Sequence, residues 1–153
     1  MTAYLADTNI IVQWVLPHDP LCPAATASVK LLLHQGHSVY VGVQNLIEFW
    51  SVATRPSSAN GLGMSPVQAA RELDRIEALF PLLEDSPAIY REWRQLAETC
   101  EVSGREAYDA RLAALVLVRG VTHILTFNVE DFRRHPGIVV VNPNDMRATP
   151  AQP

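Results

Sequence analysis

Four acidic side chains of this chain have the residue type and the positions needed to bind a metal ion together. They are far apart in the sequence, at Asp7, Glu48, Asp109 and Asp131. Each follows an apolar, strand-like run or lies in the first turns of the helix after such a run. Open α/β sheets bind ligands outside the carboxyl ends of their strands, and Mg²⁺ prefers oxygen ligands. The pattern therefore indicates a carboxylate site for a hard divalent cation.

Taken one at a time, each acid also has an ordinary structural interpretation. Asp7 and Asp131 suit the start of a helix, and Glu48 suits the exposed face of an amphipathic helix. Asp109 is harder to explain, because its helical face should be core. Four acids at the same end of four elements are even harder to explain as ordinary structural residues. Like charges about 4 Å apart repel by roughly 4 kcal/mol at an effective dielectric near 20. A bound cation would remove that conflict.

The elements that must position these acids alternate along the chain. Apolar runs predict strands over residues 3–6, 39–43, 124–127 and 138–141. Helical spacing, capping residues and prolines predict helices over residues 8–16, 20–36, 45–54, 65–80, 86–101 and 103–120. Alternating strands and helices, with strands that are apolar throughout, predict a parallel sheet covered on both faces. The helices between the second and third strands could form a hairpin that projects from the sheet.

Length and composition bound the class of protein. The 153 residues suit one domain over residues 1–145, with a loosely ordered tail over residues 146–153. The sequence has no apolar run of about 18 residues and no basic region before an apolar stretch, so we expect a cytoplasmic protein without a membrane span. Two distant cysteines, Cys22 and Cys100, are expected to be reduced.

The net charge of −4 does not favour binding of nucleic acid by bulk attraction. It leaves a nuclease open, because bound metal ions add positive charge at the site itself. Arg105 lies four residues before Asp109 and could pair with it or meet a substrate phosphate; both interpretations stay open. Arg133, Arg134 and His135 follow the last acid and could contact phosphates, although ordinary solvated charges are an equally simple interpretation.

Other enzyme classes with an Asp after the first strand fit poorly. A haloacid-dehalogenase-type phosphatase needs a second Asp two residues on, where this chain has Asn9. A receiver domain needs a lysine after a late strand, and Lys30 is the only lysine. The sequence contains no GxxxxGK phosphate loop.

The stretches around the acids resemble those of PIN-domain ribonucleases, in particular the VapC-type toxins of bacterial toxin–antitoxin pairs. The matching stretches are LADTNI, QNLIEFW, AYDARLAAL and ILTFNVEDF, and the resemblance covers residues 3–142. It implies a three-layer α/β/α sandwich with a central, mainly parallel sheet. It also implies cleavage of single-stranded or loop RNA that depends on Mg²⁺ or Mn²⁺ and leaves a 5′-phosphate.

The resemblance also assigns residues to the site. It implies that Asp7, Glu48, Asp109 and Asp131 are the metal-binding and catalytic acids. It implies supporting roles for the polar neighbours Thr8, Asn9, Thr126 and Asn128. Asn128 departs from the family, which often has another Asp there, so a second tightly bound metal is in question.

A rival interpretation of a different class is a catalytically weak PIN-like module that acts through its partner in a repressor complex. Asn128 is the feature that favours it. In either case the resemblance and the net charge predict an antitoxin whose basic tail reaches the acidic cleft. The apolar residues Leu73, Ile76, Phe80, Ile89 and Trp93 are numerous enough to suggest a homodimer, although an internal core explains them equally well.

Overall fold

The protein folds as a parallel sheet between two layers of helices, seen here in a computed structural model that describes residues 1–146. The strands are β1 (Ala3–Ala6), β2 (Ser38–Gly42), β3 (Leu82–Leu83), β4 (His123–Leu125) and β5 (Val139–Val141). The α-helices are α1 (Thr8–Trp14), α2 (Cys22–His34), α3 (Val43–Thr54), α4 (Pro66–Leu79), α5 (Pro87–Thr99) and α6 (Glu106–Val118). Three short 3₁₀ helices complete the elements: η1 (Ser57–Ala59), η2 (Val129–Asp131) and η3 (Pro143–Asp145).

All neighbouring strands of the sheet are parallel, in the order β3-β2-β1-β4-β5. The central strand β1 pairs with β2 on one side, with Tyr4 opposite Val39, and with β4 on the other, with Tyr4 opposite His123. The chain builds outward from β1 to β3 and then returns to the other side of β1. The strand order therefore reverses between β1 and β4, which is where open α/β sheets bind their ligands.

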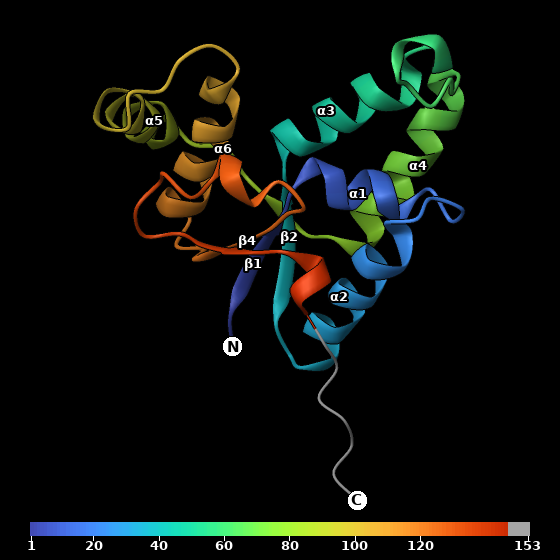
Figure 1. Ribbon diagram of the computed structural model, residues 1–153, viewed down its shortest axis with the longest axis horizontal. Helices are drawn as coiled ribbons and strands as arrows, with labels where there is room; N and C mark the ends of the chain where they lie inside the picture. Colours follow the sequence, from blue (N-terminus) through green and yellow to red (C-terminus); the bar gives the residue numbers. More distant parts are fainter. Residues whose placement is uncertain (147–153) are drawn as a thin grey trace, which may run out of the picture.

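The two faces of the sheet are covered by different helices (Figure 1). Helices α1 to α4 lie on one side, and their core includes Ile10, Val29, Phe49 and Ile76. Helices α5 and α6 lie on the other side, where Leu115 belongs to the second core. The three inner strands are largely apolar and mostly buried, whereas Leu82 and Val139, on the edge strands β3 and β5, are 45% and 49% exposed. The predicted three-layer α/β/α fold with a parallel sheet is confirmed.

Helix α6 shows how the apolar run determines packing. The run 112–118 is wholly apolar, which favours a buried helix; residues 112–116 are buried, and Leu117 and Val118 are partly buried. The helix begins at Glu106 rather than directly after Ser103, because residues 103–105 form a turn before the first helical residue. The Glu106 carboxylate still accepts a hydrogen bond from the Ser103 backbone N–H at 3.1 Å, as in a capping box.

The region between β2 and β4 differs from the sequence prediction. The sequence left open a helical hairpin there, but the short strand β3 separates α4 from α5 and pairs with β2. Helix α4 lies with α3, whereas α5 packs against α6 on the opposite face. A strand of two residues has too few positions to show a strand period, and two leucines are equally compatible with a helix end.

Other boundaries differ by a few residues. Helix α1 ends at Trp14, and α2 begins at Cys22 with proline in its first turn, not at residue 20. Helix α3 begins two residues earlier than predicted, directly after Gly42. The strands predicted at 124–127 and 138–141 are β4 and β5, each slightly shorter or shifted. Such shifts are typical of element ends.

The last residues of the predicted domain form a short 3₁₀ turn. After β5, the η3 turn lies against α2, and Pro143 is buried. Asn142 caps this turn, because its side chain accepts a hydrogen bond from the Asn144 N–H at 2.9 Å. The predicted loose tail over residues 146–153 lies, apart from Met146, outside the described residues.

The apolar residues considered for a dimer interface are used inside the chain. Ile76, Phe80 and Ile89 are buried, and Leu73 and Trp93 pack against the two cores. A homodimer therefore has no support from these side chains. Both cysteines are free. Within residues 1–146, no helix has the length and apolar character needed to cross a membrane.

Candidate active site

All four acids predicted from the sequence line one hollow of about 340 Å³ at the carboxyl edge of the sheet. We call it the acidic hollow. Its walls come from the start of α1, from α3, from α6 and from the segment after β4. The lining residues are Asp7, Thr8, Asn9, Val12, Gln13, Glu48, Val52, Asp109, Asn128 and Asp131. The fold therefore brings together side chains that are up to 124 positions apart, from Asp7 to Asp131.

Asp7 is the most buried of the acids, with 8% of its surface exposed. It ends β1 and caps α1, and its Oδ1 accepts a hydrogen bond from the Thr8 N–H at 2.7 Å. Its Oδ2 accepts from the Thr126 hydroxyl at 2.8 Å and from the Asn9 amide at 3.3 Å. The pKa of Asp7 is raised to about 6, mainly by burial. The hydrogen bonds from the Thr126 hydroxyl and the Thr8 N–H oppose the shift, and nearby Glu48 and Asp131 add to it.

Glu48 lies in the second turn of α3 and is held by two hydrogen bonds. The Thr8 hydroxyl donates to its Oε2 at 2.5 Å, and the Gln44 amide donates to its Oε1 at 2.8 Å. The Asn45 amide in turn donates to the Thr8 hydroxyl at 3.2 Å. Asn45 also fixes the start of α3, because its side-chain oxygen accepts from the Gly42 N–H at 2.9 Å. The same residues thus orient the carboxylate and anchor its helix.

Asp109 lies in the first turn of α6 and is half-buried. Its pKa is raised to about 7, first by burial and then by the charges of Asp131, Asp7 and Glu48. Arg134 opposes this shift without cancelling it. A carboxyl group with a pKa near neutral pH is only partly ionised there, so the surroundings of Asp109 disfavour its charged form.

The donor set fits a hard divalent cation better than any other ligand. The acidic hollow offers carboxylate oxygens, and the Gln13 Oε1 is a buried oxygen with no hydrogen-bond partner. Oxygen ligands of this kind suit Mg²⁺ or Mn²⁺. As they stand, no three His, Cys, Asp or Glu side chains of residues 1–146 are grouped tightly enough to hold a metal ion. Mg²⁺ usually keeps several waters, so a few protein ligands are enough.

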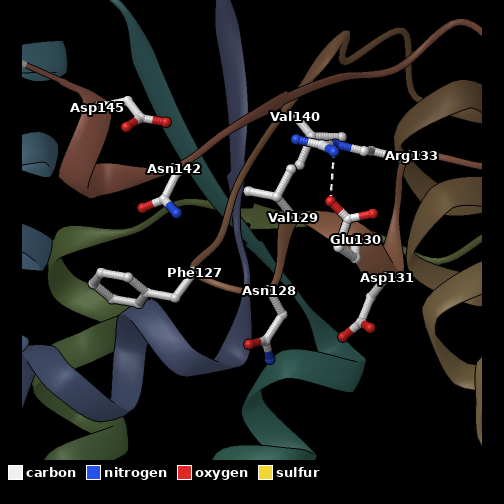
Figure 2. Close-up of a pocket in the computed structure, with 9 residues that line it drawn as sticks. All are labelled: Phe127, Asn128, Val129, Glu130, Asp131, Arg133, Val140, Asn142 and Asp145. Atoms are coloured by element: carbon white, nitrogen blue, oxygen red, sulfur yellow. Dashed lines mark ion pairs between the residues drawn. The ribbon is translucent and has the colours of Figure 1, made fainter.

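Asp131 and Asn128 line both the acidic hollow and a second hollow of about 680 Å³ (Figure 2). Their side chains point the same way, away from the Arg133–Glu130 ion pair. Asn128 precedes η2 as expected, but its side chain makes no capping hydrogen bond. Its backbone N–H instead donates to the Thr126 hydroxyl at 3.0 Å. Its side chain is exposed.

The predicted phosphate-contacting residues are in different situations. Arg105 is exposed and forms no ion pair with the acids of residues 1–146, Asp109 included. Arg133 pairs with Glu130, and Arg134 binds both carboxylate oxygens of Glu106 at 2.6 and 2.9 Å. His135 is only 2% exposed, so it is out of reach of a phosphate. Burial also lowers the pKa of His135.

Sequence reasoning missed several residues that shape the site. Gln44 links Glu48 to α6, because its amide also donates to the Tyr108 carbonyl at 3.0 Å. Arg111 donates to the Gln44 oxygen at 3.2 Å and to Asp85 at 2.9 Å. The i, i+4 spacing of Gln44 and Glu48 was a usable signal. The contact between Gln44 and Arg111 spans 67 positions and leaves no local pattern.

The fold and the site together define an α/β/α protein with an acidic ligand site at the switch point of its parallel sheet. Comparison with protein families gives this class a name. The sequence pattern of the PIN domain matches residues 4–138, so the chain belongs to the PIN-domain family. No curated protein sequence matches the chain.

Several solved structures have a similar fold. VapBC2 from Rickettsia felis, bound to a DNA fragment of its promoter, aligns with a TM-score of 0.70 and 17% identity, over 92% of this chain and 98% of that chain. FitAcB from Neisseria gonorrhoeae aligns with a TM-score of 0.66 and 23% identity, over 94% and 99%. Mycobacterium tuberculosis VapC20, described as a Sarcin-Ricin loop cleaving toxin, aligns with 0.54 and 16%, over 79% and 86%.

Proposed function

We propose that this protein is a metal-dependent endoribonuclease that acts as the toxin of a toxin–antitoxin pair. The observation that carries the proposal is the acidic hollow, where carboxylates from four separate elements meet. Structural proteins avoid such a cluster, because each added carboxylate raises the cost of ionising the others. Membership of the PIN-domain family and the similarity in fold to toxin–antitoxin complexes support the same function.

In this proposal Asp7, Glu48 and Asp109 hold Mg²⁺ or Mn²⁺, and Asp131 completes the site from the rim. When bound, the cation supplies an activated water and neutralises charge on the phosphoryl group. Thr8 and Thr126 fix the orientation of the carboxylates through the hydroxyl hydrogen bonds described above. No Ser, Cys or His nucleophile is required; attack by water with cleavage of the P–O3′ bond would leave a 5′-phosphate on one product and a 3′-hydroxyl on the other.

The partner in this proposal is an antitoxin with a basic segment. The chain has a net charge of −4, and its acidic hollow would accept an Arg or Lys side chain in place of the cation. Among the structural neighbours, several were solved as toxin–antitoxin complexes, some of them with DNA. We extend that assembly to this chain as part of the proposal, and we place the protein in the cytoplasm with its RNA substrate.

The test is to map new RNA 5′ ends across the transcriptome after brief expression of the protein. We expect new 5′-phosphate ends with the wild type and none with Asp7→Asn. A matched control is Asp145→Asn, which removes an exposed acid that lies outside the acidic hollow. Purified protein should cleave single-stranded RNA with Mg²⁺ or Mn²⁺ and stop in EDTA.

The rival function, a binding module without significant catalysis, predicts a different outcome. It is suggested by Asn128, which leaves the acidic hollow one carboxylate short of the family pattern. If the purified wild type leaves RNA intact with either metal, but still assembles with a partner on promoter DNA, the nuclease proposal is wrong.

A further inference from the structure

A third and smaller hollow opens beside the acidic hollow, between the first turns of α3 and of α6. We call it the side pocket; its volume is about 280 Å³, and it is lined by Val43, Gln44, Ile47, Glu48, Tyr108 and Arg111. Glu48 lines both hollows, so the two share a wall. A molecule whose phosphate lies among the acids can therefore place the chemical group adjacent to that phosphate in the side pocket.

Two large apolar side chains of the side pocket face solvent. Ile47 and Tyr108 are each 64% exposed, although side chains of this kind gain by burial. Ile47 lies four residues after Val43 on α3, and Tyr108 lies three residues before Arg111 on α6, so each pair shares a helical face. The side pocket therefore has an apolar lining that no other part of residues 1–146 covers, next to a site rich in charge.

The floor of the side pocket is polar and fixed in place. The Arg111 guanidinium donates to Asp85 at 2.9 Å and to Gln44 at 3.2 Å, which holds its plane. Gln44 in turn donates to Glu48 at 2.8 Å. Guanidinium carries five N–H donors, so these two bonds leave donors for a ligand. The pocket thus combines an aromatic ring, aliphatic walls and an anchored arginine, and a hydrogen-bonded chain ties it to a metal-binding acid.

We propose that the side pocket binds a nucleobase of the RNA, the one next to the phosphate that is cleaved. The base stacks on the Tyr108 ring, and its polar edge meets Arg111. Proteins read single-stranded RNA by stacking splayed bases on aromatic and arginine side chains, which are the groups gathered here. This inference rests on the proposed nuclease function, because it takes the phosphate to lie in the acidic hollow.

The polar floor favours a base over a protein partner. An apolar side chain of a partner would cover the unused N–H donors of Arg111 without accepting hydrogen bonds, which costs free energy. A base brings carbonyl and ring-nitrogen acceptors together with a flat apolar face. It also explains why the side pocket adjoins the acids, since base and phosphate belong to one nucleotide chain.

The experiment measures single-turnover cleavage of a fluorescein-labelled 12-nucleotide RNA of randomised sequence with Mn²⁺. Protein concentration is varied, and the products are sequenced. We expect Tyr108→Ala to raise the half-saturating protein concentration about tenfold, as the loss of one stacked base does, and to flatten the base preference at one position beside the cut. Tyr108→Phe keeps the ring and should behave as the wild type. Tyr90→Ala is the matched control, because Tyr90 is 61% exposed but lies outside the side pocket.

The possible outcomes distinguish a failure of the base-pocket proposal from a failure of the proposed nuclease function. Cleavage that is equal for the wild type and Tyr108→Ala, with the same base preference, would overturn the base pocket and leave the nuclease intact. No cleavage by the wild type would overturn both. A changed oligomeric state in light scattering, with unchanged affinity for RNA, would assign the surface to protein contact instead. Ile47→Ser tests the opposite wall, and its half-saturating concentration should rise as well.

Discussion

At the scale of single residues, the main feature of this protein is the conflict among four carboxylates. Asp7 and Asp109 have pKa values raised to about 6 and about 7, chiefly by burial and then by the neighbouring acids. Hydroxyl and amide donors around Asp7 oppose the shift but do not cancel it. Without a cation, the ionised side chains therefore destabilise the folded state, and a bound cation reverses the sign of that contribution.

The residue-scale prediction concerns Asp109→Asn. In EDTA at pH 8, the variant should have a higher melting temperature than the wild type, because it removes a charge that the fold disfavours. Millimolar Mg²⁺ or Mn²⁺ should raise the melting temperature of the wild type and have much less effect on the variant. Differential scanning calorimetry with and without metal measures both effects.

The pH dependence of that difference follows from the raised pKa. Below the ordinary pKa of 3.8, Asp109 is protonated in both the folded and the unfolded protein, so its ionisation does not change the free energy of unfolding. Between that value and about 7, only the unfolded protein releases the proton, so the wild type loses stability as pH rises. The increase in melting temperature of Asp109→Asn over the wild type should grow from pH 5 to pH 8, whereas Asp145→Asn should show no such trend. An advantage that shrinks with pH would contradict the proposed charge conflict.

At the scale of elements, the site depends on how β2 passes into α3. Gly42 ends the strand, and its N–H is held by the Asn45 side chain at 2.9 Å. A Cβ at this position would lie 2.5 Å from the Leu115 Cδ2 of α6. The absence of a side chain therefore lets α3, which carries Glu48, approach α6, which carries Asp109. An added side chain would force Leu115, which is fully buried in the core, to move.

The element-scale prediction is that Gly42→Ala pushes the two helices apart. We expect a loss of about 1–3 kcal/mol in the free energy of unfolding, typical of overpacking in a core. Metal should also stabilise the variant less than it stabilises the wild type. Urea unfolding with and without Mg²⁺ measures both.

Leu115→Val supplies the control for this prediction. Shortening the side chain removes the clashing methyl group, so the double variant should lose less stability than the sum of the two single variants. Strict additivity of the two changes would show that the contact between Gly42 and Leu115 is not what separates the helices.

At the scale of the whole molecule, charge and topology act together. The chain carries a net charge of −4, and its acids are concentrated where the strand order reverses. The field of such a site attracts cations and repels RNA phosphates until a metal binds. Under the proposed function, a basic protein segment would inhibit the enzyme, because it would neutralise the acids and exclude the metal at the same time.

The whole-molecule prediction is that the protein, isolated from its native cells at low salt, brings with it a small partner with an Arg- or Lys-rich segment. Mass spectrometry of the purified complex identifies the partner. Raising the ionic strength should weaken the complex, because screening reduces attraction between opposite charges. The double variant Asp7→Asn, Asp131→Asn should retain less partner than Asp145→Asn. Recovery of the wild type without any such partner would count against the toxin–antitoxin assignment.

The fold class can be predicted from the sequence, because the signals that specify it are local. Strands such as residues 3–6 are apolar on both faces, helices alternate with them, and caps such as Ser65 with Gln68 mark the helix starts. These signals act over a few residues, so they can be read from the chain. The same reading placed Asp7, Glu48, Asp109 and Asp131 at the ends of elements that meet at one edge of a parallel sheet.

Only the tertiary structure decided what lies around the acids. The strand β3, the division of α4 and α5 between the two faces, and the bond from Arg111 to Gln44 all depend on contacts between distant residues. The raised pKa of Asp109 likewise arises from burial and from charges on other elements. Such effects depend on distance in space, which spacing along the chain does not encode. The sequence therefore identified the acids, and the fold set their charge state and built the side pocket beside them.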